Sequence, residues 1–239
     1  ISLKLVSEKW IRSDKLSSQT GLLLRFFGHK VIGITGTKGK STTTNLIHHM
    51  LVCNGRKAVL AGNMGLPFFD ELESAEKSTI VAELSSHQLE TVYNSPVIAV
   101  LLNIFPEHLD HYEDFQAYAK AKWNIGLYQK WGGRLFIPAG WIGKEWLNFQ
   151  KQCSGQLTGF DALNDEIIYE FDETHISEKI DLSRLPLMGE HNLKNCAAAI
   201  GAVIEAGLEL QDAVNSLYTF TPLPHRLELI REHNGVKFI

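Results

Sequence analysis

The sequence contains little of what several protein classes require. It has only three cysteines in 239 residues, Cys53, Cys153 and Cys196, and no two of them are spaced like metal ligands. An odd, scattered set of cysteines is typical of reduced thiols in a cytoplasmic protein, which excludes a disulfide scaffold. No run of about 18 apolar residues occurs, so we expect no membrane-spanning helix.

A surplus of positive charge is also absent. The formal net charge is −4, with 23 basic and 27 acidic residues, whereas nucleic-acid-binding domains are usually basic. The first ten residues, ISLKLVSEKW, contain neither an initiator methionine nor the apolar block of a signal peptide. We therefore expect a piece of a longer cytoplasmic protein without nucleic-acid or membrane partners. The oligomeric state is not predicted.

The sequence does contain alternating strand-like and helix-like segments. Continuous apolar runs, which are typical of buried parallel strands, occupy residues 30–35, 57–61, 79–84, 97–103 and 134–137. Segments with a helical apolar period occupy residues 40–54, 67–74, 113–129, 141–151, 190–205 and 210–218. This alternation predicts an α/β fold of the P-loop type, with a mostly parallel sheet and helices on both faces.

The last residues follow a different pattern. Residues 225–239 are typical of a strand, a turn at Asn234-Gly235 and the start of a second strand. Because an isolated hairpin is only marginally stable in water, we expect residues 223–239 to be the truncated start of a further domain. Residues 29–222 are then a central domain, and residues 1–28 a remnant or linker of a preceding one.

The stretch GITGTKGKSTTT (residues 33–44) is the strongest local signal. It lies between an expected strand and an expected helix, as a phosphate-binding loop does. In such a loop Lys40 would reach the β- and γ-phosphates, and the hydroxyl of Ser41 or Thr42 would bind Mg²⁺. The general pattern expects glycine where Ile34 stands. The alternative is a flexible turn with a capping serine.

Two residues at strand ends are candidate metal ligands. Glu83 ends one apolar run, and His108 lies just beyond another. Because ligands bind at the carboxyl ends of strands in open α/β sheets, both side chains would border the phosphate loop. A carboxylate and an imidazole could then orient Mg²⁺, although Mg²⁺ prefers oxygen. The alternatives are a solvated strand end for Glu83 and an ordinary loop histidine for His108.

A lysine on an apolar helix face is the third signal. Phe115, Tyr118, Ala119 and Lys122 recur at helical spacing, which places Lys122 on the inward face, whereas Lys120 points outward. A buried lysine must pair, extend to the surface or lose its proton. A neutral lysine can react with CO₂ to form a carbamate, a new anionic oxygen ligand. From the period alone, extension to the helix edge remains the simpler alternative.

Seven motifs together resemble the Mur ligase family of ATP-dependent amino-acid ligases in peptidoglycan precursor synthesis. Beyond the phosphate loop they are GNMGLP (62–67), AELSSHQLE (82–90), NIFPEHLDHY (103–112), AYAKAK (117–122), GEHNLKN (189–195) and LPHRLE (223–228). ELSSHQLE and LPHRLE are most similar to the branch that joins D-glutamate to UDP-MurNAc-L-alanine in the bacterial cytoplasm. The resemblance covers roughly residues 30–230 and implies the cofactors ATP and Mg²⁺.

The resemblance also implies a role for each matching residue. The ATP phosphates would be bound by Gly36, Thr37, Lys38, Gly39, Lys40, Ser41 and Thr42, and further nucleotide contacts would come from Asn192, Asn195 and Arg226. The muramoyl-alanine end would be lined by Asn63, Ser85 and His108, and Mg²⁺ would be held by Ser41, Glu83, His108 and carbamylated Lys122. The catalytic residues would be Lys40, His108, Lys122 and Arg226.

One residue departs from the family pattern, because Lys38 stands where the family often has asparagine. We expect this difference to affect phosphate binding little. The chain would be the central ATP-binding domain alone, which we expect to bind nucleotide weakly and not to ligate. Alternatives are another ligase of the family, such as the third-residue ligase or folylpolyglutamate synthase, and a non-catalytic nucleotide-binding subunit.

Overall fold

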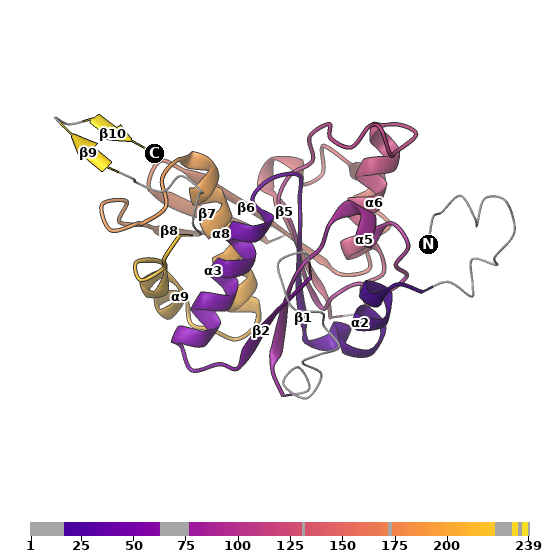
Figure 1. Ribbon diagram of the computed structural model, residues 1–239, viewed down its shortest axis with the longest axis horizontal. Helices are drawn as coiled ribbons and strands as arrows, with labels where there is room; N and C mark the ends of the chain where they lie inside the picture. Colours follow the sequence, from indigo (N-terminus) through magenta and orange to yellow (C-terminus); the bar gives the residue numbers. More distant parts are fainter. Residues whose placement is uncertain are drawn as a thin grey trace, which may run out of the picture.

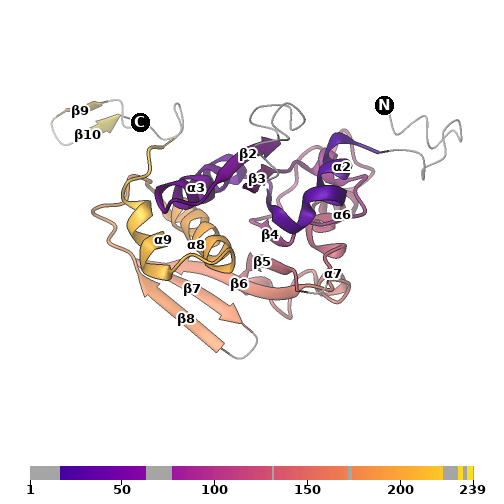
Figure 2. The same ribbon diagram turned by 90° about the horizontal axis from the view of Figure 1, so that it is seen from below.

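The computed structural model describes residues 17–62, 77–130, 132–171, 174–222, 231–233 and 236–238. The expected helix at residues 67–74 lies outside this part of the chain. Within it, one sheet of eight strands carries helices on both of its faces (Figures 1 and 2). The α/β class with a mostly parallel sheet is therefore confirmed.

The sheet has the strand order β2-β3-β1-β4-β5-β6-β7-β8. Its members are β1 (Val31–Thr35), β2 (Ala58–Gly62), β3 (Thr79–Glu83), β4 (Ile98–Leu101), β5 (Arg134–Pro138), β6 (Gln156–Leu163), β7 (Glu166–Phe171) and β8 (Thr174–Lys179). Pairings from β2 to β6 are parallel, and β6-β7 and β7-β8 are antiparallel. β1 is central, so the loop that follows it emerges in the middle of the parallel edge.

The helices form two layers, one on each face of the sheet (Figure 2). One layer holds α3 (Lys40–Cys53), α8 (Glu190–Glu205) and α9 (Leu210–Leu217), and the other holds α2 (Gln19–Phe27), α5 (Ser86–Leu89), α6 (Phe115–Leu127) and α7 (Leu147–Gln150). Each layer packs its own apolar cluster against the sheet. The inward face of α3 is formed by Leu46, Ile47, Met50 and Leu51, which are all buried.

The segment after β5 differs from the prediction. The sequence predicts one helix over residues 141–151, but a 3-10 turn (Ala139–Trp141) and the short α7 are separated by an irregular stretch. Gly143 and Trp146 take positive φ angles of 65° and 59°, which a continuous helix does not allow. The side chain of Gln150 instead bonds the backbone of Gly143, Trp141 and Glu145 across the stretch.

Two helices were not predicted, although their caps are visible in the sequence. The Ser18 hydroxyl accepts a hydrogen bond from Gly21 N at the start of α2. Ser85 and Gln88 form a reciprocal capping box at the start of α5. α2 contributes to the same apolar cluster as β3 and α6. The domain boundary at residue 28 stays a prediction.

The expected terminal hairpin is present as a separate pair of strands. β9 (Arg231–His233) and β10 (Val236–Phe238) pair antiparallel to each other and form their own two-stranded sheet. The predicted turn between them lies outside the described residues. In the parts of the chain that the structure describes, no helix has the length and apolar character to cross a membrane.

Candidate functional site

The phosphate loop connects β1 to α3 at the carboxyl edge of the sheet. α3 begins at Lys40, directly after Gly39, whose φ of 89° is in the left-handed region. A Cβ on Gly39 would come within 2.4 Å of the Asn195 Oδ1 atom on α8. Glycine is therefore required here both for the backbone conformation and for the close approach of α8.

Two lysine amines meet at one backbone oxygen of this loop. Lys40 Nζ donates to the carbonyl oxygens of Gly36 and Thr37 at 3.0 and 3.1 Å. Lys122 Nζ, on α6, donates to the same Gly36 oxygen at 2.8 Å. The structure thus brings together two predicted site residues that are far apart in the sequence, one from each helical layer.

Lys122 lies on the inward face of α6, as the apolar spacing predicts, and its amine is buried rather than extended to the helix edge, which the period alone favoured. Its exposed fraction is 2%, whereas Lys120 is exposed. The amine lies 4.8 Å from the ring centre of Tyr118. Burial lowers the pKa of Lys122 to about 7, with a further lowering by Lys40 and an opposing effect of Glu107. A fraction of the amine is therefore neutral near physiological pH, which is the form that can react with CO₂.

Glu83 lies at the carboxyl end of β3, next to β1. It pairs with Ile34 in the parallel register and is 2% exposed. Its Oε2 atom is buried without a hydrogen-bond partner among the described residues. A buried, unpaired carboxylate oxygen is costly unless something else satisfies it. The predicted Mg²⁺ role of Glu83 therefore fits its surroundings.

Three further predicted metal and substrate residues, Ser41, Ser85 and His108, lie in the described part of the chain. Ser41 is buried in the first turn of α3. The Ser85 hydroxyl caps α5, where it accepts from Gln88 N at 3.2 Å. His108 is half exposed and has a φ of 57°, an uncommon conformation for histidine. Among the described residues, no three His, Cys, Asp or Glu side chains are grouped as a metal-ligand set.

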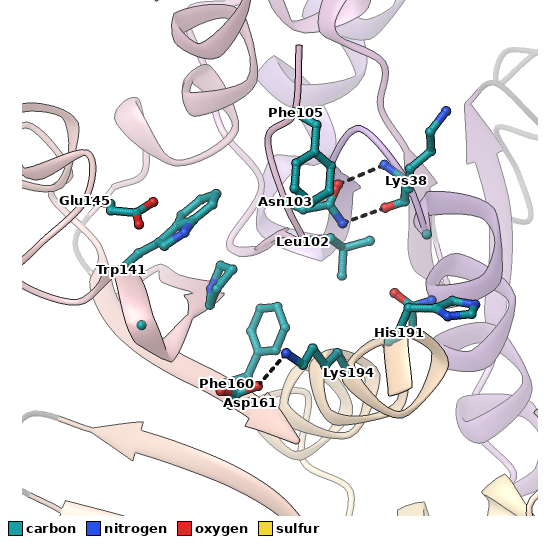
Figure 3. Close-up of a pocket in the computed structure, with 14 residues that line it drawn as sticks. Lys38, Leu102, Asn103, Phe105, Trp141, Glu145, Phe160, Asp161, His191 and Lys194 are labelled. Carbon is teal, nitrogen blue, oxygen red and sulfur yellow. Dashed lines mark hydrogen bonds and ion pairs between the residues drawn. The ribbon is translucent and has the colours of Figure 1, made fainter. Parts of the chain in front are cut away.

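A cavity of about 650 Å³ lies beside the phosphate loop (Figure 3). Its walls include Lys38 and Gly39 of the loop, Asn195 of α8, and the aromatic side chains of Trp141 and Phe160. Concave sites with apolar walls and a few polar groups are typical of small-molecule binding. The Trp141 side chain lies across the cavity from Lys38 (Figure 3). The cavity therefore offers apolar surface beyond the phosphate-binding edge.

The predicted asparagine pair lies on α8, and Asn195 lines this cavity. Asn192 and Asn195 are each 6% exposed, and Asn195 Nδ2 donates to Asn192 Oδ1 at 3.1 Å. Asn192 Nδ2 in turn donates to Met188 O at 2.8 Å. Asn195 contacts the phosphate loop through Gly39, as described above. The two remaining predicted site residues, Asn63 and Arg226, lie outside the described residues.

Several residues at this edge were assigned no role from the sequence. Asn103 and Glu107 contact the phosphate loop directly, with Glu107 Oε1 accepting from Lys38 Nζ at 2.9 Å. The His87 ring lies 5.1 Å from that of His108 and 4.4 Å from that of His111. Both groups follow strands whose carboxyl ends share this edge, a signal that could have predicted their proximity.

Replacing Glu83 by glutamine is expected to stabilise the Mg²⁺-free chain by about 1 kcal/mol or more, because it removes a buried carboxylate with an unpaired oxygen. The same change is expected to abolish any rise in melting temperature on adding Mg²⁺. Thermal unfolding with and without Mg²⁺ measures both effects. Glu113→Gln, at an exposed position, is the control. A destabilised Glu83→Gln chain that still responds to Mg²⁺ would contradict the assignment.

Comparison with known sequences identifies relatives that are named as ligases. The chain is 33% identical over 234 residues to the UDP-N-acetylmuramoylalanine–D-glutamate ligase of Ruminiclostridium cellulolyticum, covering 94% of the chain and 50% of that protein. It is 37% identical over 219 residues to the ligase of the same name from Protochlamydia amoebophila, covering 88% and 48%. The chain therefore spans about half the length of these relatives.

Solved structures show the same fold. A MurF ligase of Thermotoga maritima in complex with ADP matches with a TM-score of 0.61 at 19% identity, over 91% of this chain and 54% of that one. A MurF of Acinetobacter baumannii matches with a TM-score of 0.63 at 20% identity, over 88% and 50%. A family model described as the Mur ligase middle domain matches residues 34–203. The chain therefore belongs to the Mur ligase middle-domain family.

Proposed function

We propose that this chain is the ATP-binding part of an amide ligase of peptidoglycan precursor synthesis, which adds D-glutamate to UDP-MurNAc-L-alanine in the bacterial cytoplasm. The observation that carries the proposal is the meeting of Lys40 and Lys122 at the Gly36 carbonyl. A phosphate loop alone would suit many nucleotide-binding proteins. A second amine beside that loop, which is buried and has a pKa near 7, is a feature that a simple nucleotide switch does not require.

The proposed reaction is the one that membership in this ligase family implies. A substrate carboxylate oxygen would attack the γ-phosphorus of ATP, releasing ADP and forming an acyl phosphate. The amino group of D-glutamate would then attack the acyl carbon, losing a proton as phosphate leaves. Both the carboxylate and the triphosphate are anionic, so cationic groups must offset their repulsion. Lys40, which bonds the loop, is the first proposed cation, and Arg226 is the second.

The protein groups proposed for Mg²⁺ are Ser41, Glu83, His108 and the Lys122 carbamate. Bound Mg²⁺ would neutralise phosphate charge during transfer. The unpaired Glu83 oxygen and the reactive Lys122 amine are the observations that support this set. Lys122 would change from a donor to Gly36 into an anionic oxygen ligand after carbamylation.

We assign the substrate positions from the phosphate loop and from the residues that line the cavity beside it. The phosphates of ATP would lie along residues 36–42, and the nucleoside would enter the cavity bounded by Asn195 and Trp141. Asn192 would support Asn195 from within α8. The muramoyl-alanine end would lie toward Ser85, His108 and Asn63. The names of the relatives favour D-glutamate as the added amino acid over the other acceptors of the family.

Lys40→Ala is expected to weaken binding of Mg²⁺-ATP by roughly 10- to 100-fold, because a charge-assisted contact to phosphate is lost. Titration calorimetry with the full-length protein that contains this chain measures the change. Lys57→Ala, at an exposed position before β2, is the matched control and is expected to bind like the unaltered protein. Equal affinities for the Lys40 and Lys57 variants would refute the phosphate assignment. Ligation of D-glutamate by the unaltered protein tests the reaction itself.

A further inference from the structure

Asn103 occupies a position to which the sequence patterns assign no role. It follows β4 in the sequence and lies at the edge of the cavity beside Lys38 (Figure 3). β4 is the neighbour of β1 in the sheet. Asn103 therefore reaches the phosphate loop from the adjacent strand end rather than from the loop itself.

The Asn103 side chain makes three hydrogen bonds to the backbone of the loop. Its Oδ1 atom accepts from Thr37 N at 3.0 Å and from Lys38 N at 2.9 Å. Its Nδ2 atom donates to Lys38 O at 3.0 Å (Figure 3). The amide therefore uses both its acceptor and its donor on two consecutive residues of the loop.

Further contacts join the same two segments. Thr37 N also reaches the backbone oxygen of Asn103 at 3.0 Å. The Thr37 hydroxyl accepts from Phe105 N at 2.9 Å and lies 2.9 Å from the Tyr118 hydroxyl. Lys38 Nζ donates to Glu107. The loop and residues 103–107 thus form one hydrogen-bonded unit, which ends beside His108.

This arrangement explains how a glycine-rich loop can be ordered. Gly36 and Gly39 flank Thr37 and Lys38, and glycine loses more conformational freedom on ordering than any other residue. Backbone donors bind phosphate best when they are fixed before the ligand arrives, because ordering then costs no binding free energy. Here the Thr37 and Lys38 amides are themselves bound to Asn103, and the order that this supplies benefits the backbone donors that follow them at the start of α3.

We propose that Asn103 is a positioning residue, which holds the phosphate loop in its phosphate-binding conformation and fixes that loop relative to the turn carrying His108. This inference rests on the proposed function, since it assumes that the loop binds the phosphates of a nucleotide. Asn103 acts through Thr37 and Lys38. The role predicts a loss of affinity that is confined to phosphate-bearing ligands.

The test compares Asn103→Ala with Asn54→Ala in the full-length protein. Asn54 donates to Met50 O and Ser216 Oγ at the far end of α3, so its removal also breaks two side-chain hydrogen bonds. α3 has 14 residues, which places Asn54 about 20 Å from the loop. Mg²⁺-ADP and adenosine are titrated against each variant by NMR, and hydrogen exchange of the Thr37 and Lys38 amides is followed in parallel.

We expect Asn103→Ala to weaken Mg²⁺-ADP binding by about tenfold or more, given the loss of three hydrogen bonds. Adenosine binding should stay within about twofold, and the Lys38 amide should exchange faster, whereas the Thr37 amide keeps the backbone oxygen of Asn103 as its acceptor. Asn103→Asp, which keeps the acceptors but lacks the donor, should restore the protection of the Lys38 amide. Asn54→Ala should change none of these readouts, even if it lowers the melting temperature.

Two results would overturn the inference while leaving the proposed function intact. One is unaltered Mg²⁺-ADP affinity in Asn103→Ala. The other is an equal loss of ADP and adenosine binding, which would indicate a general disturbance of the cavity. If the unaltered protein binds neither Mg²⁺-ADP nor Mg²⁺-ATP, the proposed function fails and this inference fails with it.

Discussion

Replacing Lys122 by methionine is expected to lower ligase activity by at least a hundredfold, a size typical of losing one charged group that stabilises a transition state. Methionine has a similar length and is apolar, so it fills the buried site on α6 without an amine. It cannot donate to Gly36 or form a carbamate. The activity of the full-length protein at saturating ATP measures the loss.

Lys120→Met is the matched control, because Lys120 lies on the exposed face of the same helix. Its activity should equal that of the unaltered protein. Carbamylation is tested separately by carbon-13 NMR after incubation with labelled CO₂, where the unaltered protein should give a carbamate signal that Lys122→Met lacks. Activity of Lys122→Met within about threefold of the control would contradict a catalytic role.

The same substitution has an expected signature in the pH dependence of stability. The pKa of Lys122 is about 7 in the folded chain, against an ordinary value of 10.5. Between these values the unfolded chain binds the extra proton, so this group makes the free energy of unfolding rise with pH, by about 1.4 kcal/mol per unit. Below pH 7 the amine is charged in both states, so the folded chain bears the full cost of burying a charged amine.

Lys122→Met should therefore be more stable than the unaltered chain at pH 7, and this difference should shrink as the pH approaches 10.5. Urea unfolding in CO₂-depleted buffer at several pH values measures it. Taking the difference between the two proteins cancels the other titrating groups. A difference that is independent of pH in this range would show that Lys122 keeps an ordinary pKa.

Gly39→Ala is expected to abolish detectable nucleotide binding and to destabilise the chain by about 2 kcal/mol or more. The φ of 89° disfavours any Cβ, and the new methyl group would overlap the Asn195 side chain of α8. Relief of this overlap requires the Asn195 side chain, which is buried and bonded to Asn192, to move or the loop to shift. Asn195 and the loop both line the proposed nucleotide cavity, so either movement would change the shape of the site.

Gly55→Ala separates the effect of backbone strain from the effect of the overlap with Asn195. Gly55 also has a positive φ, of 71°, but a Cβ added to it would have no atom within 4 Å. Its substitution should therefore cost only the backbone strain, about 1 kcal/mol, and leave nucleotide binding unchanged. Chemical unfolding and Mg²⁺-ATP titration of both variants provide the comparison. Equal destabilisation by the two substitutions would mean that the contact with Asn195 has no energetic weight.

The parts of the fold that could be predicted are those that depend on short sequence patterns. The apolar runs predicted the parallel strands, because a buried strand needs apolar residues on both faces. The spacing of Tyr118, Ala119 and Lys122 predicted the inward direction of Lys122. The irregular stretch around Gly143 and Trp146 was not predicted. Its conformation depends on hydrogen bonds of Gln150, which cannot be inferred from the spacing of apolar residues.

The site could be predicted only in part for a similar reason. The phosphate loop is a local motif, and its position between β1 and α3 followed from the neighbouring segments. The contacts of Asn103 with Thr37 and Lys38 join residues more than 60 positions apart. Such contacts depend on which strands become neighbours, and the order β3-β1-β4 was not predicted. The overlap that forbids a side chain on Gly39 likewise depends on where α8 packs.

The antiparallel end of the sheet has a consequence for solubility. β8 pairs with β7 and is the last strand in the order, so among the described strands one side of its backbone has no neighbour in the sheet. An open edge of this kind can pair with the edge of another copy and start aggregation. β8 carries Glu178 and Lys179 and only one large apolar residue, Ile176. Replacing these charges by apolar residues would therefore affect self-association more than folding.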